Sequence, residues 1–148
     1  MNDEKFMLEA LKEAQKASKK GDVPIGAIIV CNNKIIAKGH NKKENKKNAV
    51  LHAEIIAIQK ACKKKKTWYL NDCTLYVTLE PCMMCTGAII QSRIKEVVFA
   101  AASPKFGCVE SIQKIKNGSH NHIPFVKSGI CCEKSAEILK DFFENKRG

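Results

Sequence analysis

The sequence predicts a three-layer α/β domain, in which helices cover both faces of one mixed sheet of about five strands. Stretches with helical periodicity alternate with short β-rich stretches along the chain. A strand, a helix and a strand follow one another between residues 74 and 101, which predicts a right-handed crossover with parallel pairing, whereas an earlier two-residue turn predicts an antiparallel hairpin. The length of 148 residues suits one core, so we expect a single domain over residues 1–148.

The individual elements follow from hydrophobic periodicity and from turn residues. Met7 and Leu11 begin one apolar stripe of a helix, and Gly21 is a typical stop signal. The pair Asn32-Asn33 tolerates the positive φ that a two-residue hairpin turn requires. In chain order we expect a helix over 4–19, strands over 24–31 and 34–39, a helix from 52 to about 65, a strand over 74–79, a helix over 82–92, a strand over 96–101, an irregular segment over 103–122 with a short helix near 109–115, a strand over 125–128 and a helix over 132–145.

The chain is strongly basic, with a formal net charge of +11. Such a charge favours polyanionic partners such as nucleic acid. The lysine-rich stretches 42–47 and 63–66 are equally compatible with phosphate contacts and with solvated surface. No apolar run approaches the ~18 residues of a membrane span, and charged residues occur from Asp3 onward. We therefore expect a cytoplasmic protein without a signal peptide and without a membrane partner.

The eight cysteines fit a reducing compartment better than a disulfide scaffold. Two of them belong to the metal-binding motif described next. Four others lie in or beside apolar stretches, where a reduced cysteine packs as a small hydrophobic residue: Cys31, Cys62, Cys73 and Cys108. We expect these four to be free thiols.

The most informative motif combines His-Ala-Glu at 52–54 with Pro-Cys-Met-Met-Cys at 81–85. One imidazole and two thiolates fill three positions of a tetrahedral zinc site and leave the fourth open for water, as in catalytic sites. A nearby carboxylate can take a proton from that water and deliver it to a ring nitrogen of the substrate. We therefore predict His52, Cys82 and Cys85 as the ligands of one Zn²⁺ per subunit, with Glu54 as the catalytic residue. The combination matches the signature of the zinc deaminases.

The spacing of these residues constrains the local structure. Cys82 and Cys85 lie on one face of a helix, whose N-terminus favours thiolates. His52 and Glu54 would point about 200° apart inside a helix of ~3.6 residues per turn, so they converge only if His52 stands at the very start of its helix. A lone Cys-x-x-Cys is also typical of redox motifs and of structural zinc sites. The upstream His-x-Glu, and the absence of a second Cys-x-x-Cys from the sequence, favour the catalytic interpretation.

Beyond this signature, the chain resembles the bacterial tRNA-specific adenosine deaminases of the cytidine deaminase superfamily over essentially its whole length. The stretches that carry the resemblance are Val-Pro-Ile-Gly-Ala at 23–27, Gly-His-Asn at 39–41, Leu-Tyr-Val-Thr-Leu-Glu-Pro-Cys at 75–82, Gly-Ala-Ile-Ile at 87–90, Ser-Arg-Ile at 92–94, Asn-His at 121–122 and Asp-Phe-Phe at 141–143. The resemblance implies a cytidine-deaminase-like fold. It also implies conversion of adenosine to inosine at the wobble position of a tRNA anticodon loop, by a homodimer whose two subunits both contact the RNA.

Individual residue roles follow from the same resemblance. It implies that Asn41 hydrogen-bonds the splayed-out base and that Pro24 and Ile25 line the purine pocket. A flipped loop nucleotide also needs cationic and stacking groups to hold its neighbours, and Lys105 and Phe143 are candidates for that shell. The complete set of substrate-binding residues expected in this way is Pro24, Ile25, Asn41, Ala53, Ser103, Lys105 and Phe143.

One departure concerns substrate preference. Ser103 stands where the family usually has an Asp that contacts nucleic acid beside the target base. A serine hydroxyl can still hydrogen-bond a 2′-hydroxyl, the group that distinguishes RNA from DNA, so the sequence leaves that preference open, as it does the identity of the tRNA. Two alternatives also stay open: a deaminase of a free base or nucleoside such as guanine or cytosine, and a non-enzymatic zinc protein that binds RNA.

Overall fold

The computed structural model describes residues 2–118 and 120–147. The helices and strands are α1 (Asp3–Lys19), β1 (Gly26–Cys31), β2 (Lys34–His40), α2 (Ala53–Lys65), β3 (Cys73–Leu79), α3 (Met83–Gln91), β4 (Glu96–Ala101), η1 (Ile115–Asn117), β5 (Phe125–Ser128) and α4 (Cys132–Arg147). The five strands form one sheet in the order β2-β1-β3-β4-β5. β1 pairs antiparallel with β2 and β3, whereas the β3–β4 and β4–β5 pairs are parallel. The expected mixed sheet is confirmed.

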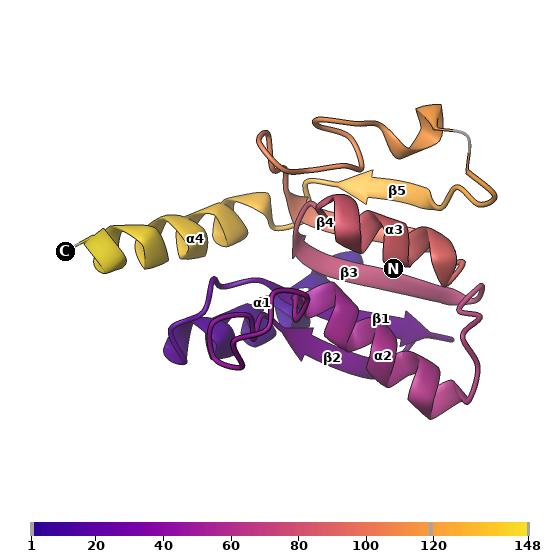
Figure 1. Cartoon of the computed structure of the whole chain (residues 1–148), viewed down its shortest axis with the longest axis horizontal. Helices are drawn as coiled ribbons and strands as arrows, with labels where there is room; N and C mark the ends of the chain where they lie inside the picture. The colour runs from indigo at the N-terminus through magenta and orange to yellow at the C-terminus, as the bar shows by residue number, and fades with distance from the viewer. Residues whose placement is uncertain (1, 119, 148) are drawn as a thin grey trace.

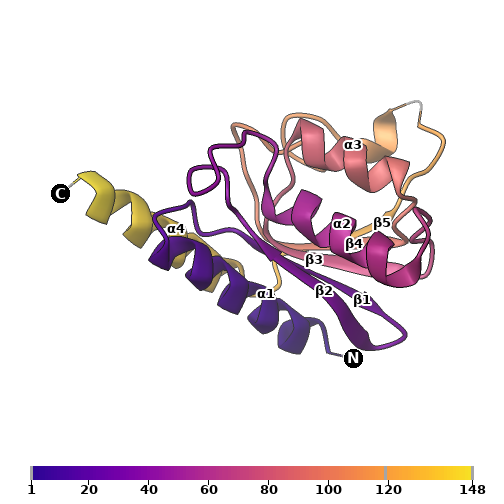
Figure 2. The same cartoon turned by 60° about the horizontal axis from the view of Figure 1, so that its bottom comes forward.

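Helices cover both faces of this sheet (Figures 1 and 2). α2 and α3 lie on one face, and α1 and α4 lie on the other. The strand β1 shows why the sheet is buried on both sides, since successive side chains point to opposite faces. Ala27 and Ile29 pack in the cluster that contains α2 and α3, whereas Ile28 and Val30 pack with α1. The three-layer fold class, with both motif-bearing helices on one face, is confirmed.

The hairpin between β1 and β2 has the turn that the sequence predicts. Asn32 and Asn33 adopt φ values of 51° and 64°, in the left-handed region that two-residue hairpin turns require. β1 and β2 then pair antiparallel along their length, with an irregularity between Ile29 and Val30.

The strands that run parallel to β3, including β5, all finish at the same end of the sheet as β3. Because β1 is antiparallel to both β2 and β3, and β4 is parallel to β3, the strands β2, β3 and β4 all finish at this edge. Glu80, just after β3, donates its backbone N–H to the carbonyl of Ala101 at the end of β4, at 2.8 Å. Ligands bind preferentially outside the carboxyl ends of such strands. The segments that lead into α2 and α3 start from the same edge.

The prediction of a short helix near residues 109–115 is wrong. The only helical turn that the described part of this segment contains is η1, a 3-10 turn at Ile115–Asn117. The backbone N–H groups of Val109, Glu110 and Ser111 instead donate to the carboxylate of Glu80. A side chain from a distant segment thus replaces the local helical hydrogen bonds.

The expectation of free thiols is wrong for two cysteines. Cys31 and Cys73 form a disulfide between β1 and β3. They are direct partners in the antiparallel register, and their Cα atoms are 4.5 Å apart, within the range that a disulfide spans. Only the pairing of the strands reveals this proximity, since the two residues are 42 positions apart in the sequence. Cys62 and Cys108 are free, as expected.

None of the helices in residues 2–118 and 120–147 is both long enough and apolar enough to cross a membrane.

Candidate active site and metal centre

The start of α2 brings His52 and Glu54 together. His52 is the residue before the first helical turn and has an extended backbone, with φ −77° and ψ 155°. Its carbonyl accepts the first helical hydrogen bond, from Ile56 N–H at 3.1 Å. Because His52 itself lies outside the helical geometry, its side chain and that of Glu54 line the same cavity. This is the arrangement that the two-residue spacing required.

Two close contacts fix this helix start against the sheet. The side-chain Oδ1 of Asn41 accepts the backbone N–H of Ala53 at 2.9 Å. Gly39 in β2 faces α2 so closely that a Cβ atom there would lie 2.6 Å from the Ala53 carbonyl oxygen. A larger residue would push the helix away from β2. The segment Gly39–Asn41 therefore sets the position of His52 and Glu54.

The side chains of His52, Cys82 and Cys85 converge on one point. His52 Nδ1 is 3.7 Å from Cys82 Sγ and 3.6 Å from Cys85 Sγ. Tetrahedral zinc, with bonds of about 2.3 Å to sulfur and about 2.0–2.1 Å to nitrogen, would separate these atoms by about 3.5 Å. The three potential ligand atoms all lie within 4.8 Å of one another. The donor set and its spacing therefore fit a zinc ion with a fourth position left over.

The start of α3 places both cysteines. Cys82 is the residue before the first turn, with φ −75° and ψ 180°, and its carbonyl accepts Thr86 N–H at 2.8 Å. In the metal-free protein, a hydrogen bond from Cys85, together with one from His52, lowers the pKa of Cys82 to about 3. The pKa of the Cys85 thiol is raised, because the thiol donates this hydrogen bond and because it is buried. Zinc binding would displace this proton, because metal ligation requires the thiolate.

Glu54 is a buried carboxyl group beside these ligands. Its side chain is 4% exposed. Burial raises its pKa to about 7, because the ionised form loses its hydration. A carboxyl group with a pKa near neutrality can both accept and return a proton, which is the property that a general acid–base residue needs.

These groups open into one cavity of about 670 Å³, a size typical of small-molecule sites. Most of the predicted substrate-binding residues line it: Ile25, Asn41, Ser103, Lys105 and Phe143. Pro24 and Ala53 are buried but do not line it. Ala53 instead donates its backbone N–H to the side chain of Asn41, and Pro24 lies in the segment that leads into β1.

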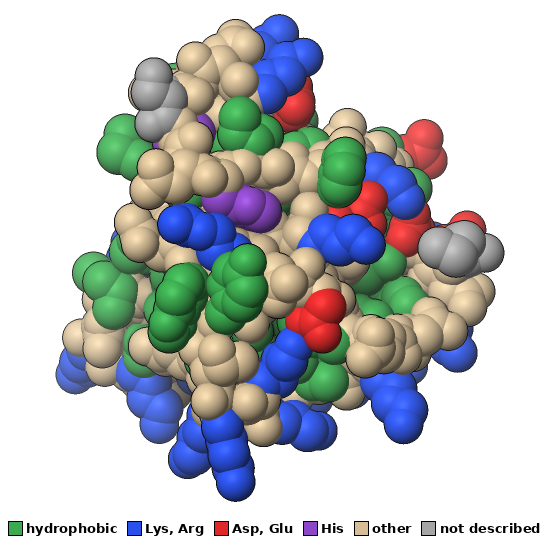
Figure 3. All heavy atoms as spheres, turned by 90° about the vertical axis from the view of Figure 1, so that its right-hand side faces the viewer, with side chains coloured by type: hydrophobic (Ala, Val, Ile, Leu, Met, Phe, Trp, Pro, Cys, Tyr) green, Lys and Arg blue, Asp and Glu red, His purple; other side chains and the backbone are tan. Residues whose placement is uncertain are grey.

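The stretch 63–66 forms the last turn and the C-cap of α2, about 16 to 21 Å from His52 at ~1.5 Å per helical residue. On the side of the molecule shown in Figure 3, lysine and arginine side chains are interspersed with hydrophobic and other side chains.

Glu80 and Phe106 are among the residues of this cavity that sequence reasoning missed. Glu80 accepts hydrogen bonds from backbone N–H groups of Ser103, Val109, Glu110 and Ser111, at 2.6 to 3.1 Å. These bonds and one from the Ser111 hydroxyl lower its pKa against the opposing effect of burial, which is the largest influence. An acidic residue directly after an apolar strand was the available signal, since a carboxylate in that position needs partners.

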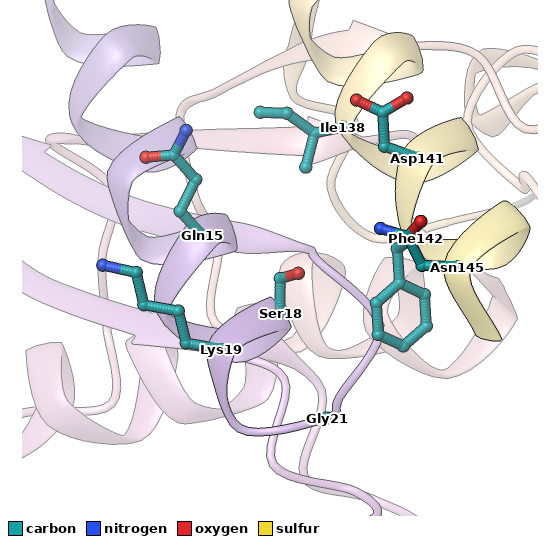
Figure 4. Close-up of a pocket in the computed structure, with 8 residues that line it drawn as sticks. All are labelled: Gln15, Ser18, Lys19, Gly21, Ile138, Asp141, Phe142 and Asn145. Carbon is teal, nitrogen blue, oxygen red and sulfur yellow. The ribbon is translucent and has the colours of Figure 1, made fainter.

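A second cavity of nearly the same volume, about 660 Å³, lies between α1 and α4 (Figure 4). Its lining side chains come from Gln15, Ser18 and Lys19 of α1 and from Ile138, Asp141, Phe142 and Asn145 of α4, with Gly21 between. It contains no histidine or cysteine and one carboxylate, so it lacks the groups of a metal centre. The chemistry of the lining residues, rather than the cavity volume, therefore identifies the cavity around Glu54 as the candidate active site.

Comparison with known proteins agrees with this selection. Residues 1–147 match the family of MafB19-like deaminases. The tRNA-specific adenosine deaminase of Bacillus subtilis is 47% identical over 146 residues, which cover 98% of this chain and 91% of that protein. The chain belongs to the family of tRNA-specific adenosine deaminases. The Aquifex aeolicus member of this family is 43% identical over 147 residues, covering 99% of this chain and 97% of its own.

Solved structures give the same result for the fold. A structure from work on A-to-I editing by tRNA:A34 deaminases at the wobble position matches with a TM-score of 0.88 and 40% identity, covering 91% of this chain and 99% of its own. A guanine deaminase from Nitrosomonas europaea matches with a TM-score of 0.82 at 24% identity, covering 94% of this chain and 83% of its own. The second likeness concerns the fold alone. The family assignment and the cytidine-deaminase-like fold predicted from the sequence are confirmed.

Proposed function

We propose that this protein catalyses the zinc-dependent hydrolytic deamination of adenosine to inosine at the wobble position of a tRNA anticodon loop. The observation that carries the proposal is the convergence of His52, Cys82, Cys85 and the buried Glu54 in one cavity. The family membership supports the choice of substrate, since relatives across the full chain are named tRNA-specific adenosine deaminases.

Each residue has a distinct part in this proposal. His52, Cys82 and Cys85 hold one zinc ion per subunit, which when bound supplies a Lewis acid that lowers the pKa of a water molecule. Glu54 accepts a proton from the attacking water and delivers it to the purine ring nitrogen next to the amine-bearing carbon.

Asn41 orients the base. Its Oδ1 is engaged by Ala53 N–H, so its amide nitrogen is the end that donates to the purine. Ile25 and Leu79 offer apolar surface for the ring, and Ser103 offers a hydroxyl to the ribose. Lys43 and Lys105 are exposed on the same cavity, where they can neutralise phosphates. The net charge of +11 acts in the same direction.

We further propose that the enzyme works as a homodimer in the cytoplasm, where its tRNA substrate is found. The support for the dimer is the resemblance to the family.

The test is inosine formation in a synthetic anticodon stem-loop by the zinc-loaded protein, with free adenosine, guanine and cytosine assayed alongside for ammonia release. Inosine in the stem-loop, with little release from the free compounds, is the expected result. Ammonia release from a free base, with no inosine formed in the stem-loop, would refute the proposal and indicate that the enzyme deaminates a small molecule. A zinc-loaded protein inert toward all four would indicate a non-catalytic zinc protein.

A further inference from the structure

Phe106 is an aromatic side chain on the cavity wall that the fold itself does not use. It is 70% exposed, and it lies in the loop that follows β4. Among the large hydrophobic side chains exposed in the described chain, Phe106 and Phe143 are the two that line the cavity around Glu54. Leaving such a ring in water forgoes the free energy of burial, which a partner surface would recover.

The backbone on both sides of Phe106 is tied down. Ser103 N–H on one side and Val109 N–H on the other donate to Glu80, each at 3.1 Å. Next to the ring, Gly107 N–H donates to the Ser103 carbonyl at 2.8 Å, and Cys108 N–H donates to the Pro81 carbonyl at 2.9 Å.

The loop also packs closely against the Glu80 side chain. A Cβ on Gly107 would lie 2.3 Å from the Glu80 carboxyl carbon. Since Glu80 is two positions before Cys82, these contacts tie the loop to the metal-binding segment. The backbone that carries Phe106 is therefore held in place, which reduces the entropy lost when a ligand packs against the ring.

The surroundings of the ring indicate the class of ligand. The exposed ammonium groups of Lys43 and Lys105 lie on the same cavity. An aromatic face beside cationic side chains is the combination that binds unpaired nucleotides, because bases stack on the ring while phosphates pair with the charges. A free nucleoside held at Glu54 would have no second base to place on Phe106.

We infer that Phe106 is a specificity-determining residue on which the base adjacent to the target adenosine stacks. This inference depends on the proposed function, and it makes the enzyme selective for an unpaired strand over a free nucleoside. Phe106 is not part of the stretches through which the chain resembles its family.

The test is a double-mutant cycle that combines substitution of Phe106 with removal of a base from the RNA. Inosine formation is measured with the normal stem-loop and with stem-loops that carry an abasic nucleotide on one or the other side of the target adenosine. For the wild type, one of the abasic stem-loops should lower kcat/KM about 5- to 150-fold, which corresponds to ~1–3 kcal/mol of stacking. In Phe106→Ala the normal stem-loop should show the same loss, and the abasic change should then cost nothing more.

Three controls make the outcome decisive. Phe106→Trp should restore both the rate and the sensitivity to the abasic change. Phe125→Ala, which removes an equally exposed phenylalanine on β5, should behave as the wild type. Zinc content should stay the same in all variants. Equal abasic losses in Phe106→Ala and in the wild type would overturn the role of Phe106 while leaving the proposed function intact. A zinc-loaded wild type that forms no inosine in the normal stem-loop would overturn the proposed function, and this inference with it.

Discussion

Reduction of the Cys31–Cys73 disulfide should lower the stability of the fold by a measurable amount. The bond joins the adjacent strands β1 and β3, and both residues lie in the buried cluster beneath α2 and α3. Breaking it frees a loop whose ends are 42 residues apart. Loop-closure entropy gives about 3 kcal/mol for a 15-residue loop and about 4.7 kcal/mol for 100 residues, so about 4 kcal/mol is expected here. For a domain of this size, that corresponds to a decrease in Tm of roughly 8 to 16 °C.

The assay is thermal unfolding of the air-oxidised protein with and without a phosphine reductant, at a fixed zinc concentration because zinc itself stabilises the fold. A phosphine is preferred to a dithiol, which would compete for the metal. The matched control is the double variant Cys31→Ala with Cys73→Ala, whose Tm should not respond to the reductant. Alkylation under denaturing conditions, before reduction, should leave both cysteines unmodified in the oxidised wild type. An oxidised wild type with the same Tm in both conditions, or with both thiols alkylated, would refute the reasoning.

Further predictions concern Glu54 and Gly39. Glu54→Gln should keep its zinc but deaminate about 100-fold more slowly or worse; a near-normal rate would exclude Glu54 as the proton carrier. In chelator-treated protein, the folded pKa of Glu54 is about 7, above its ordinary 4.5, so stability should fall as pH rises through this interval, and the fall should be smaller in Glu54→Gln. Urea unfolding at several pH values checks this, and identical pH profiles would contradict it. Gly39→Ala should lower the free energy of unfolding by ~1–3 kcal/mol, since its Cβ would meet the Ala53 and Ala57 backbone. Gly87→Ala, where nothing lies within 4 Å, is the matched control, and equal stabilities of the two variants would count against the close packing of α2 on β2.

Features that depend on local pattern could be predicted from the sequence. The turn at Asn32-Asn33 and the helices that begin after His52 and Cys82 follow from periodicity and from residue preferences within a few positions. The candidate metal-binding set was recognisable because the chemistry of zinc leaves few combinations of residues.

Features that depend on pairing between distant segments could not be predicted. The disulfide requires the β1–β3 register, and the irregular course of residues 103–111 depends on a carboxylate that is 23 to 31 positions earlier. The position of Phe106 on the cavity follows from that same loop, so it was equally hidden. Pro24 shows the converse, because the resemblance placed it in the pocket lining and the structure buries it beside the lining.

The coordination of zinc in the purified protein tests the central claim most directly. X-ray absorption at the zinc edge should show one zinc ion per chain with two sulfur ligands at about 2.3 Å, one imidazole nitrogen at about 2.0–2.1 Å and one exchangeable oxygen. Four protein ligands around the ion, or a Cys82–Cys85 pair that binds no zinc, would contradict the account.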